Sequence, residues 1–164
     1  MANKRLRAYR ELAEKLRALF DTGDIPIEIR NGRMVVRLSN AIMFDSGRAE
    51  LKPQGREALR KIVTVLKEAR GRKFIVAGHT DNVPINKKSL TFKSNRELSG
   101  ARALAVLRFL EDAGMPPEQL AHAGYGEFLT LVANDTAEGR AQNRRTEIII
   151  EPMIDEIPVF PDQL

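Results

Sequence analysis

The chain has 164 residues, the size of one domain with short extensions. It has no cysteine, which excludes disulfides, thiolate metal sites and cysteine nucleophiles, and no run of about 18 apolar residues that would span a membrane. The net charge is +5, of which +4 arises from six basic and two acidic residues within 1–17. The nearly neutral remainder, with 5% aromatic residues, argues against a nucleic-acid partner.

A helical pattern opens the chain. Apolar residues recur at steps of three and four over residues 4–20, which predicts an amphipathic helix. The helix packs either on the body of the protein or on another chain, and we favour the body. The segment lacks the apolar stretch of a secretory signal peptide. The chain is therefore either cytosolic or the soluble part of a longer protein.

A β-hairpin is predicted next, because two strand-like segments, 25–30 and 33–38, flank Asn31 and Gly32. This dipeptide is typical of a type I′ turn, in which both central residues take positive φ. Apolar and polar residues alternate in the first segment, so one face of the hairpin is expected to be buried.

Helices and strands alternate through the rest of the chain. The predicted elements are a helix over 51–69, a strand over 73–77, a loop over 82–94, a helix from Ser94 to Gly114, a turn or short helix over 117–120, a strand near 121–123, an irregular stretch over 124–139, and a last strand over 145–151. Ser94 and Glu97 have the spacing of a capping box. This order predicts the α/β class, specifically an α+β sandwich with a mixed sheet and helices packed on one face. Three units are expected: an N-terminal helix and linker (1–24), a folded domain (25–151) and an extended tail (152–164).

One group of polar residues has a spacing that suggests a binding site. Asp81 follows the C-terminal end of a strand, while Asn95, Ser99 and Arg102 lie on one stripe of the next helix. A carboxylate and a guanidinium in one pocket suit a zwitterion, with Asp81 binding an ammonium and Arg102 a carboxylate. The alternative is a simple ion pair of Arg102 with Asp81 or with a glutamate on a solvated face.

The motifs of enzymes and metal sites are weak by comparison. His79 and Asp81 have no third ligand at a usual spacing, and His122 belongs to a separate strand. We therefore expect a structural histidine, no metal, no cofactor and no catalytic residue. A phosphate-binding glycine loop and a nucleophile elbow are also absent from the sequence.

A cluster of arginines surrounds Asn143. Arg140, Arg144 and Arg145 either hydrogen-bond loop carbonyls and pair with nearby carboxylates, or they form an anion site. We favour the structural role and keep Asn143 as a possible ligand contact.

Five segments together resemble one family, the OmpA-like peptidoglycan-associated domain. They are FDSGRAEL (44–51), GHTDNVPI (78–85), SNRELSGARA (94–103), GYGE (124–127) and NDTAEGRAQNRRTEI (134–148). The resemblance spans about 40–151. The long loop between Asp81 and Asn95 is similar to that of the branch that contains the flagellar stator protein MotB.

The resemblance implies binding without catalysis. Members of the family bind meso-diaminopimelate in the stem peptide of peptidoglycan, so peptidoglycan is the expected partner. The matching ligand-binding positions are Asp81, Arg102, Asn95, Thr80, Leu98, Asn143 and Asp45. A peptidoglycan hydrolase that uses His79 and Asp81 is disfavoured, because the sequence has no second carboxylate at a spacing typical of a catalytic pair and no set of metal ligands.

The resemblance also implies a place in the cell. We expect a periplasmic or cell-envelope protein, attached to the outer or inner membrane through an N-terminal membrane or lipid anchor that this sequence lacks. Its function would be to anchor an envelope protein to the cell wall. The alternative is a stator component of the MotB type, in which the domain forms a homodimer.

Overall fold

The computed structural model describes residues 2–20, 25–86 and 88–153. The elements are α1 (Ala2–Ala18), β1 (Ile27–Arg30), β2 (Arg33–Ser39), α2 (Asn40–Met43), α3 (Pro53–Leu66), β3 (Phe74–His79), α4 (Asn95–Asp112), a 3-10 turn (Pro117–Gln119), β4 (Leu120–Gly126), α5 (Ala137–Asn143) and β5 (Arg145–Ile150). None of the helices in these ranges is long and apolar enough to cross a membrane.

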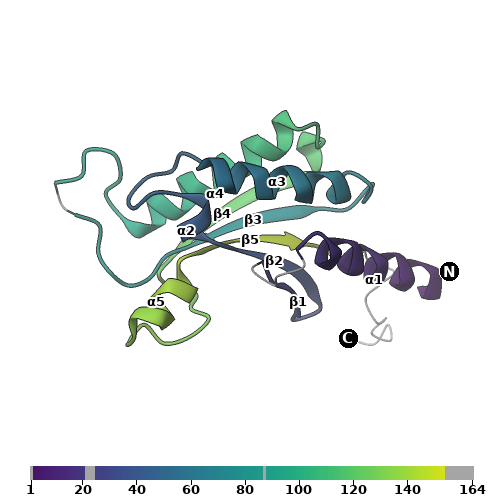
Figure 1. Ribbon diagram of the computed structural model, residues 1–164, viewed down its shortest axis with the longest axis horizontal. Coiled ribbons are helices and arrows are strands. Elements are labelled where there is room, and N and C mark those ends of the chain that lie inside the picture. Colours follow the sequence, from purple (N-terminus) through teal and green to yellow (C-terminus); the bar gives the residue numbers. More distant parts are fainter. Residues whose placement is uncertain (1, 21–24, 87, 154–164) are drawn as a thin grey trace, which may run out of the picture.

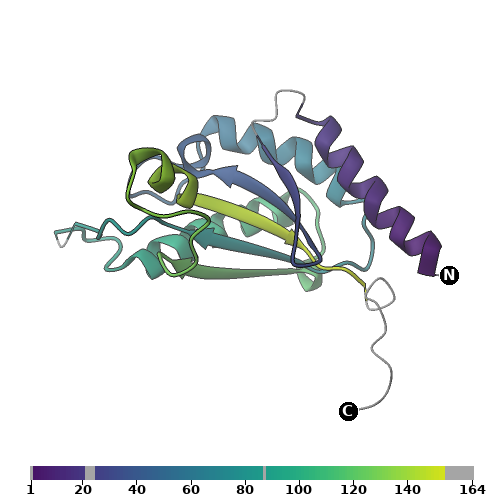
Figure 2. The ribbon, with the colours of Figure 1, turned by 90° about the horizontal axis from the view of Figure 1, so that it is seen from below.

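The five strands form one mixed sheet in the order β1-β2-β5-β3-β4. Strand β5 lies between β2 and β3 and is antiparallel to both, whereas β3 and β4 are parallel and are connected through α4. Figure 1 shows α3 and α4 above the sheet, and in Figure 2 the strands lie in front of these two helices. The mixed sheet with helices on one face confirms the predicted fold class.

The core lies between the sheet and the helices. Val36, Ile148 and Val76 are neighbours across β2, β5 and β3, and all three are fully buried. The residues next to them along each strand point to the opposite face, as the two-residue repeat of a strand requires. Helix α1 packs on the body through Leu16, and its Tyr9 hydroxyl donates to the Ile150 carbonyl and accepts from the Met34 amide.

Helix α4 approaches the backbone of β3 and β4 very closely, and glycines make this possible. A Cβ atom on Gly78 would lie 2.1 Å from the Ser99 carbonyl oxygen, and one on Gly124 would lie 2.6 Å from the Gly100 amide nitrogen. Both distances are far below van der Waals contact. The backbone of α4 therefore rests directly on the two parallel strands, and its N-terminal turn is held at the C-terminal end of β3.

Most predicted elements are present, with two additions. The hairpin turn has φ 53° at Asn31 and 75° at Gly32, as predicted, and the Ser94 side chain caps α4 by accepting from the Glu97 amide. The short helix α2 was not predicted, and α5 begins within the stretch predicted to be irregular. Most of the predicted tail over 152–164 lies outside the described residues.

Candidate ligand-binding site

A cavity of about 660 Å³ opens where β3 ends and α4 begins. Its walls come from α2 and the segment after it, the loop that follows β3, the first two turns of α4, and the end of α5. Three charged residues line it within the described part of the chain: Asp81, Arg102 and Arg144. Val83, Pro84, Ile85, Phe92, Leu98 and Phe44 form its apolar walls.

The carboxylate of Asp81 is held firmly at the base of the loop. Its Oδ1 accepts from the Val83 amide at 3.0 Å, and its Oδ2 accepts from Arg144 Nη1 at 2.6 Å. Asn95, the first residue of α4, donates from its side-chain amide to the Val83 carbonyl at 3.0 Å. The loop and the helix start are therefore tied together around the carboxylate, whose side chain is only 10% exposed.

Arg102 is buried on α4, about one turn after Leu98. Its Nε donates to the Arg48 carbonyl at 2.7 Å, its Nη2 donates to the Asp45 carbonyl at 3.1 Å, and the guanidinium lies over the Phe44 ring. Burial and the like charge of Arg144 lower the pKa of Arg102 to about 10, against the opposing effect of Asp81. The group remains protonated at neutral pH and lines the cavity as a desolvated cation.

Asp81 and Arg102 do not form an ion pair with each other, which was the alternative interpretation of their spacing. The ion-pair partner of Asp81 is Arg144, which comes from the C-terminal end of α5. Two guanidinium groups, one buried and one 44% exposed, thus share a cavity with one carboxylate. The spacing of residues along α4 could not reveal this arrangement, because Arg144 is 63 positions from Asp81.

Asn40 fixes the wall of the cavity opposite the loop. Its backbone amide donates to the Arg144 carbonyl, its side-chain amide donates to the His79 carbonyl, and its side-chain oxygen accepts from Thr146. The residue joins α2, β3 and β5 where the three meet. Sequence reasoning missed it, since a single asparagine at the start of a four-residue helix has no periodic pattern around it.

The cavity brings together five of the seven predicted site residues. Thr80, Asp81, Asn95, Leu98 and Arg102 line it. The Asp45 side chain is exposed, and its carbonyl holds Arg102. Asn143 is fully buried and does not belong to the lining; it accepts from the Leu131 and Val132 amides and so pins that loop. The part that any of them plays in binding stays a prediction.

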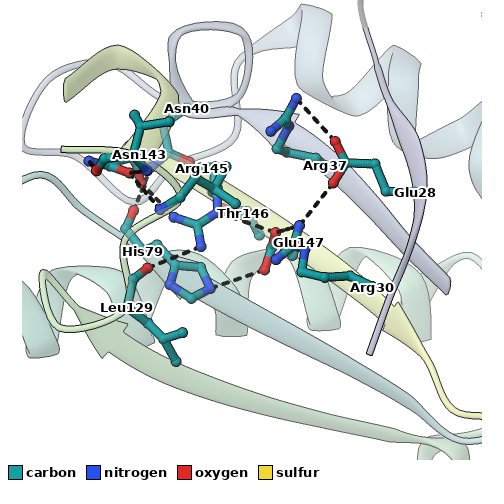
Figure 3. Close-up of polar contacts among 12 residues, drawn as sticks. Glu28, Arg30, Arg37, Asn40, His79, Leu129, Asn143, Arg145, Thr146 and Glu147 are labelled. Carbon is teal, nitrogen blue, oxygen red and sulfur yellow. Dashed lines mark hydrogen bonds and ion pairs between the residues drawn. The ribbon is translucent and has the colours of Figure 1, made fainter. Parts of the chain in front are cut away.

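The arginine cluster around Asn143 separates into two roles. Arg140 donates to the Asn134 carbonyl, and Arg145 donates to the Asn143 and Leu129 carbonyls, as the structural interpretation predicted. Arg145 is 1% exposed and lies beside Glu147 (Figure 3). Only Arg144 of the three lines the cavity.

A buried polar cluster supports the site from the face of the sheet opposite the helices. His79 is 2% exposed and lies 3.3 Å from a Glu147 oxygen (Figure 3). Its ring also stacks on the Tyr125 ring. Burial lowers the pKa of His79, so the ring is neutral at neutral pH. Burial alone would raise the pKa of Glu147, but contacts with His79 and Arg30 and the charge of Arg145 lower it to about 2.

The His79 ring is thus packed between Glu147 and Tyr125 on the sheet, and it does not line the cavity. Within the described residues, no group of three or more side chains could hold a metal ion.

The lowered pKa values of His79 and Glu147 predict that the folded protein loses stability in acid, over a defined range of pH. His79 binds its proton less readily in the folded than in the unfolded chain, so stability begins to fall as the pH drops below its ordinary value of 6.5. Glu147 contributes stability above 4.5, and about 3 kcal/mol is lost as the pH falls from 4.5 to about 2. Urea unfolding between pH 8 and about pH 2 measures this. A stability that stays constant across this range would contradict the assignment.

The fold and the cavity define an α+β domain with a charged cavity at the end of its mixed sheet. Comparison with known protein families matches residues 43–144 to the OmpA family, and the chain belongs to this family. Motility protein B of Bacillus subtilis is 36% identical over 120 residues, which cover 73% of this chain and 45% of that protein. The probable lipoprotein YiaD of Escherichia coli is 32% identical over 143 residues, 87% of this chain and 61% of that protein. The chain thus spans about half the length of these relatives.

Solved structures agree with this assignment. A putative MotB-like protein from Desulfovibrio vulgaris has a TM-score of 0.83 and 28% identity, covering 93% of this chain and 99% of that one. The cell wall anchor of the type VI secretion system from Pseudomonas aeruginosa has a TM-score of 0.77 and 30% identity, covering 87% and 97%. Both matches include nearly the whole of the solved chains.

Proposed function

We propose that the cavity binds the zwitterionic end of meso-diaminopimelate in a peptidoglycan stem peptide, without catalysis, and so anchors an envelope protein to the cell wall. The observation that carries this proposal is the placement of Asp81 and Arg102 in one cavity, each buried and each charged. The free end of meso-diaminopimelate has one ammonium and one carboxylate. The ammonium would bind Asp81 and the carboxylate would bind Arg102.

The contacts around the Asp81 and Arg102 side chains support a binding site that is already formed before the ligand binds. Backbone carbonyls of Asp45 and Arg48 hold two of the three guanidinium nitrogens of Arg102, so its orientation is fixed before a ligand arrives. The Val83 amide and Arg144 do the same for Asp81. Preorganisation reduces the ordering cost of binding. A single stem peptide still makes few contacts, so we expect micromolar to millimolar affinity and tight attachment only through many sites on a polymer.

The relatives support an envelope location. They include proteins named outer membrane protein A and outer-membrane lipoprotein, and a solved structure described as a cell wall anchor. We infer that this chain also acts in the periplasm or cell envelope.

A titration with a meso-diaminopimelate tripeptide, followed by amide NMR shifts, tests the proposal. We expect shifts around residues 80–102 and a loss of affinity of at least about tenfold in Asp81→Asn and in Arg102→Ala, because each removes one charge-assisted contact. The same peptide with lysine in place of meso-diaminopimelate lacks the carboxylate of the zwitterionic end. It should bind the parent chain at least as weakly as the meso-diaminopimelate peptide binds Arg102→Ala. Arg108→Ala is the matched control, since Arg108 is an exposed arginine of the same helix outside this cavity. A folded parent chain that gives no shifts would refute the proposal.

A second candidate is a flagellar stator domain of the MotB type. The similarity to motility protein B and to a MotB-like structure favours it. This function would use the same cavity, with the domain acting as a homodimer. A concentration-dependent dimer in sedimentation would favour the stator function over a monomeric anchor.

A further inference from the structure

The cavity has more positive charge than one zwitterionic group can neutralise. Asp81, Arg102 and Arg144 are its charged lining residues among those that the structure describes, and they sum to +1. A bound ammonium and carboxylate add zero, so the surplus remains when the proposed ligand binds. The question is which group of the ligand faces the remaining cation.

Arg144 is the guanidinium that a second anion can reach. Its side chain is 44% exposed, whereas Arg102 is 5% exposed and donates to two loop carbonyls. Among the residues that the structure describes, the one hydrogen bond and ion pair of the Arg144 side chain is with Asp81 Oδ2. Its backbone is fixed separately, through bonds with Arg140 and Asn40. The side chain can therefore change partners without moving the wall of the cavity.

An ammonium that binds Asp81 would compete with Arg144 for the same carboxylate. Oδ1 already accepts from the Val83 amide and Oδ2 from Arg144, so an incoming ammonium shares one of these oxygens with a donor that is already bound. At either oxygen it draws on the same negative charge that compensates Arg144. When the ammonium shares the Asp81 carboxylate, the Asp81–Arg144 ion pair becomes weaker. The positive charge of Arg144 is then only partly balanced, and it lies near the like charge of Arg102. A second carboxylate on the ligand would relieve this deficit.

Stem peptides offer such a carboxylate in one chemical form and not in another. Beside the zwitterionic end, the peptide has the α-carboxyl groups of its D-glutamate and of the other diaminopimelate centre, each of which is negative when free and neutral when amidated. We propose that Arg144 makes the cavity selective for stem peptides with a free carboxylate next to the zwitterionic end, and that amidated peptides bind more weakly. This rests on the proposed function and names the form of the ligand.

Two tripeptides test the proposal directly. Both contain an unmodified zwitterionic end of meso-diaminopimelate; in one the two neighbouring carboxyl groups are free, and in the other both are primary amides. We expect the parent chain to bind the free form about tenfold more tightly at low salt, with a smaller difference at high salt because the charges at the mouth of the cavity are screened. In Arg144→Gln the two peptides should bind with equal affinity. Arg144→Lys should retain part of the difference.

The outcomes separate this inference from the proposed function. If the parent chain binds both peptides equally well, the selectivity is refuted and the proposed function stands. If neither peptide binds to a folded parent chain, the proposed function itself fails. If Arg144→Gln retains the full difference, the second carboxylate is recognised elsewhere and the assignment to Arg144 is overturned. The half-exposed position of Arg144 makes misfolding of the variants a minor concern, and amide NMR spectra verify it.

Discussion

Replacing Gly78 by alanine is expected to destabilise the protein by more than about 4 kcal/mol, a large part of the roughly 5–15 kcal/mol by which an ordinary domain is stable. The new methyl group would lie 2.1 Å from the Ser99 carbonyl oxygen and 2.8 Å from its carbon. Both are backbone atoms of α4, so no side-chain rotation relieves the overlap. The helix must move away from β3, which would also separate Asn95 from the loop around Asp81. Urea unfolding measures the loss, or the yield of soluble protein where the variant fails to fold.

Gly100→Ala is the matched control on the facing helix. Its Cβ atom would lie 4.0 Å from Gly124 Cα, which is an ordinary contact. Alanine is also favoured over glycine inside a helix by about 1 kcal/mol, so this variant should be as stable as the parent or more stable. Equal stabilities of Gly78→Ala and the parent would show that α4 is farther from the sheet than described.

Glu147→Gln should cost about 3–5 kcal/mol at neutral pH, because it removes the anion from a buried charge cluster. Arg145 is 1% exposed and Glu147 2% exposed, and Arg30 donates to the same carboxylate at 2.7 Å. The amide has nearly the same shape as the carboxylate, so the loss reports the charge. The variant should also lack the part of the acid instability that falls between pH 4.5 and about 2.

Glu28→Gln provides the comparison for this prediction. Glu28 contacts Arg30 at 3.2 Å and Arg37 at 3.3 Å, but its side chain is 36% exposed (Figure 3). Water compensates exposed charges, so the change should cost less than about 1 kcal/mol. Urea unfolding of both variants at pH 7 measures the difference. Similar costs for the two would mean that the Glu147 carboxylate is solvated and that its lowered pKa has another origin.

Local sequence signals predicted the elements whose boundaries are set by neighbouring residues. The dipeptide Asn31-Gly32 sets the hairpin turn because it tolerates positive φ at both positions, and Ser94 sets the start of α4 through a bond to an amide three residues away. The helical stripe that contains Asn95 and Arg102 was visible for the same reason, since spacing along one helix is a local property.

The features that were missed depend on contacts between distant segments. Helices α2 and α5 have four and seven residues, too few for a hydrophobic period to be recognised. The pairing of Arg144 with Asp81 exists only because β5 lies beside β3, which brings the end of α5 to the end of that strand. No property of the residues around Arg144 alone distinguishes it from Arg140 and Arg145.

The position of α1 has a mechanical consequence. The loop between β3 and α4, which lines the cavity, and the start of α1 lie toward opposite ends of the longest axis of the molecule, and the strands run roughly along that axis (Figure 1). A pull between these two ends enters the sheet near Tyr9, whose hydroxyl bridges β2 and β5, and acts nearly parallel to the strands. The ladder bonds of β5 with β2 and β3 then share the tension as a group in shear, whereas a pull across the sheet would break them one after another.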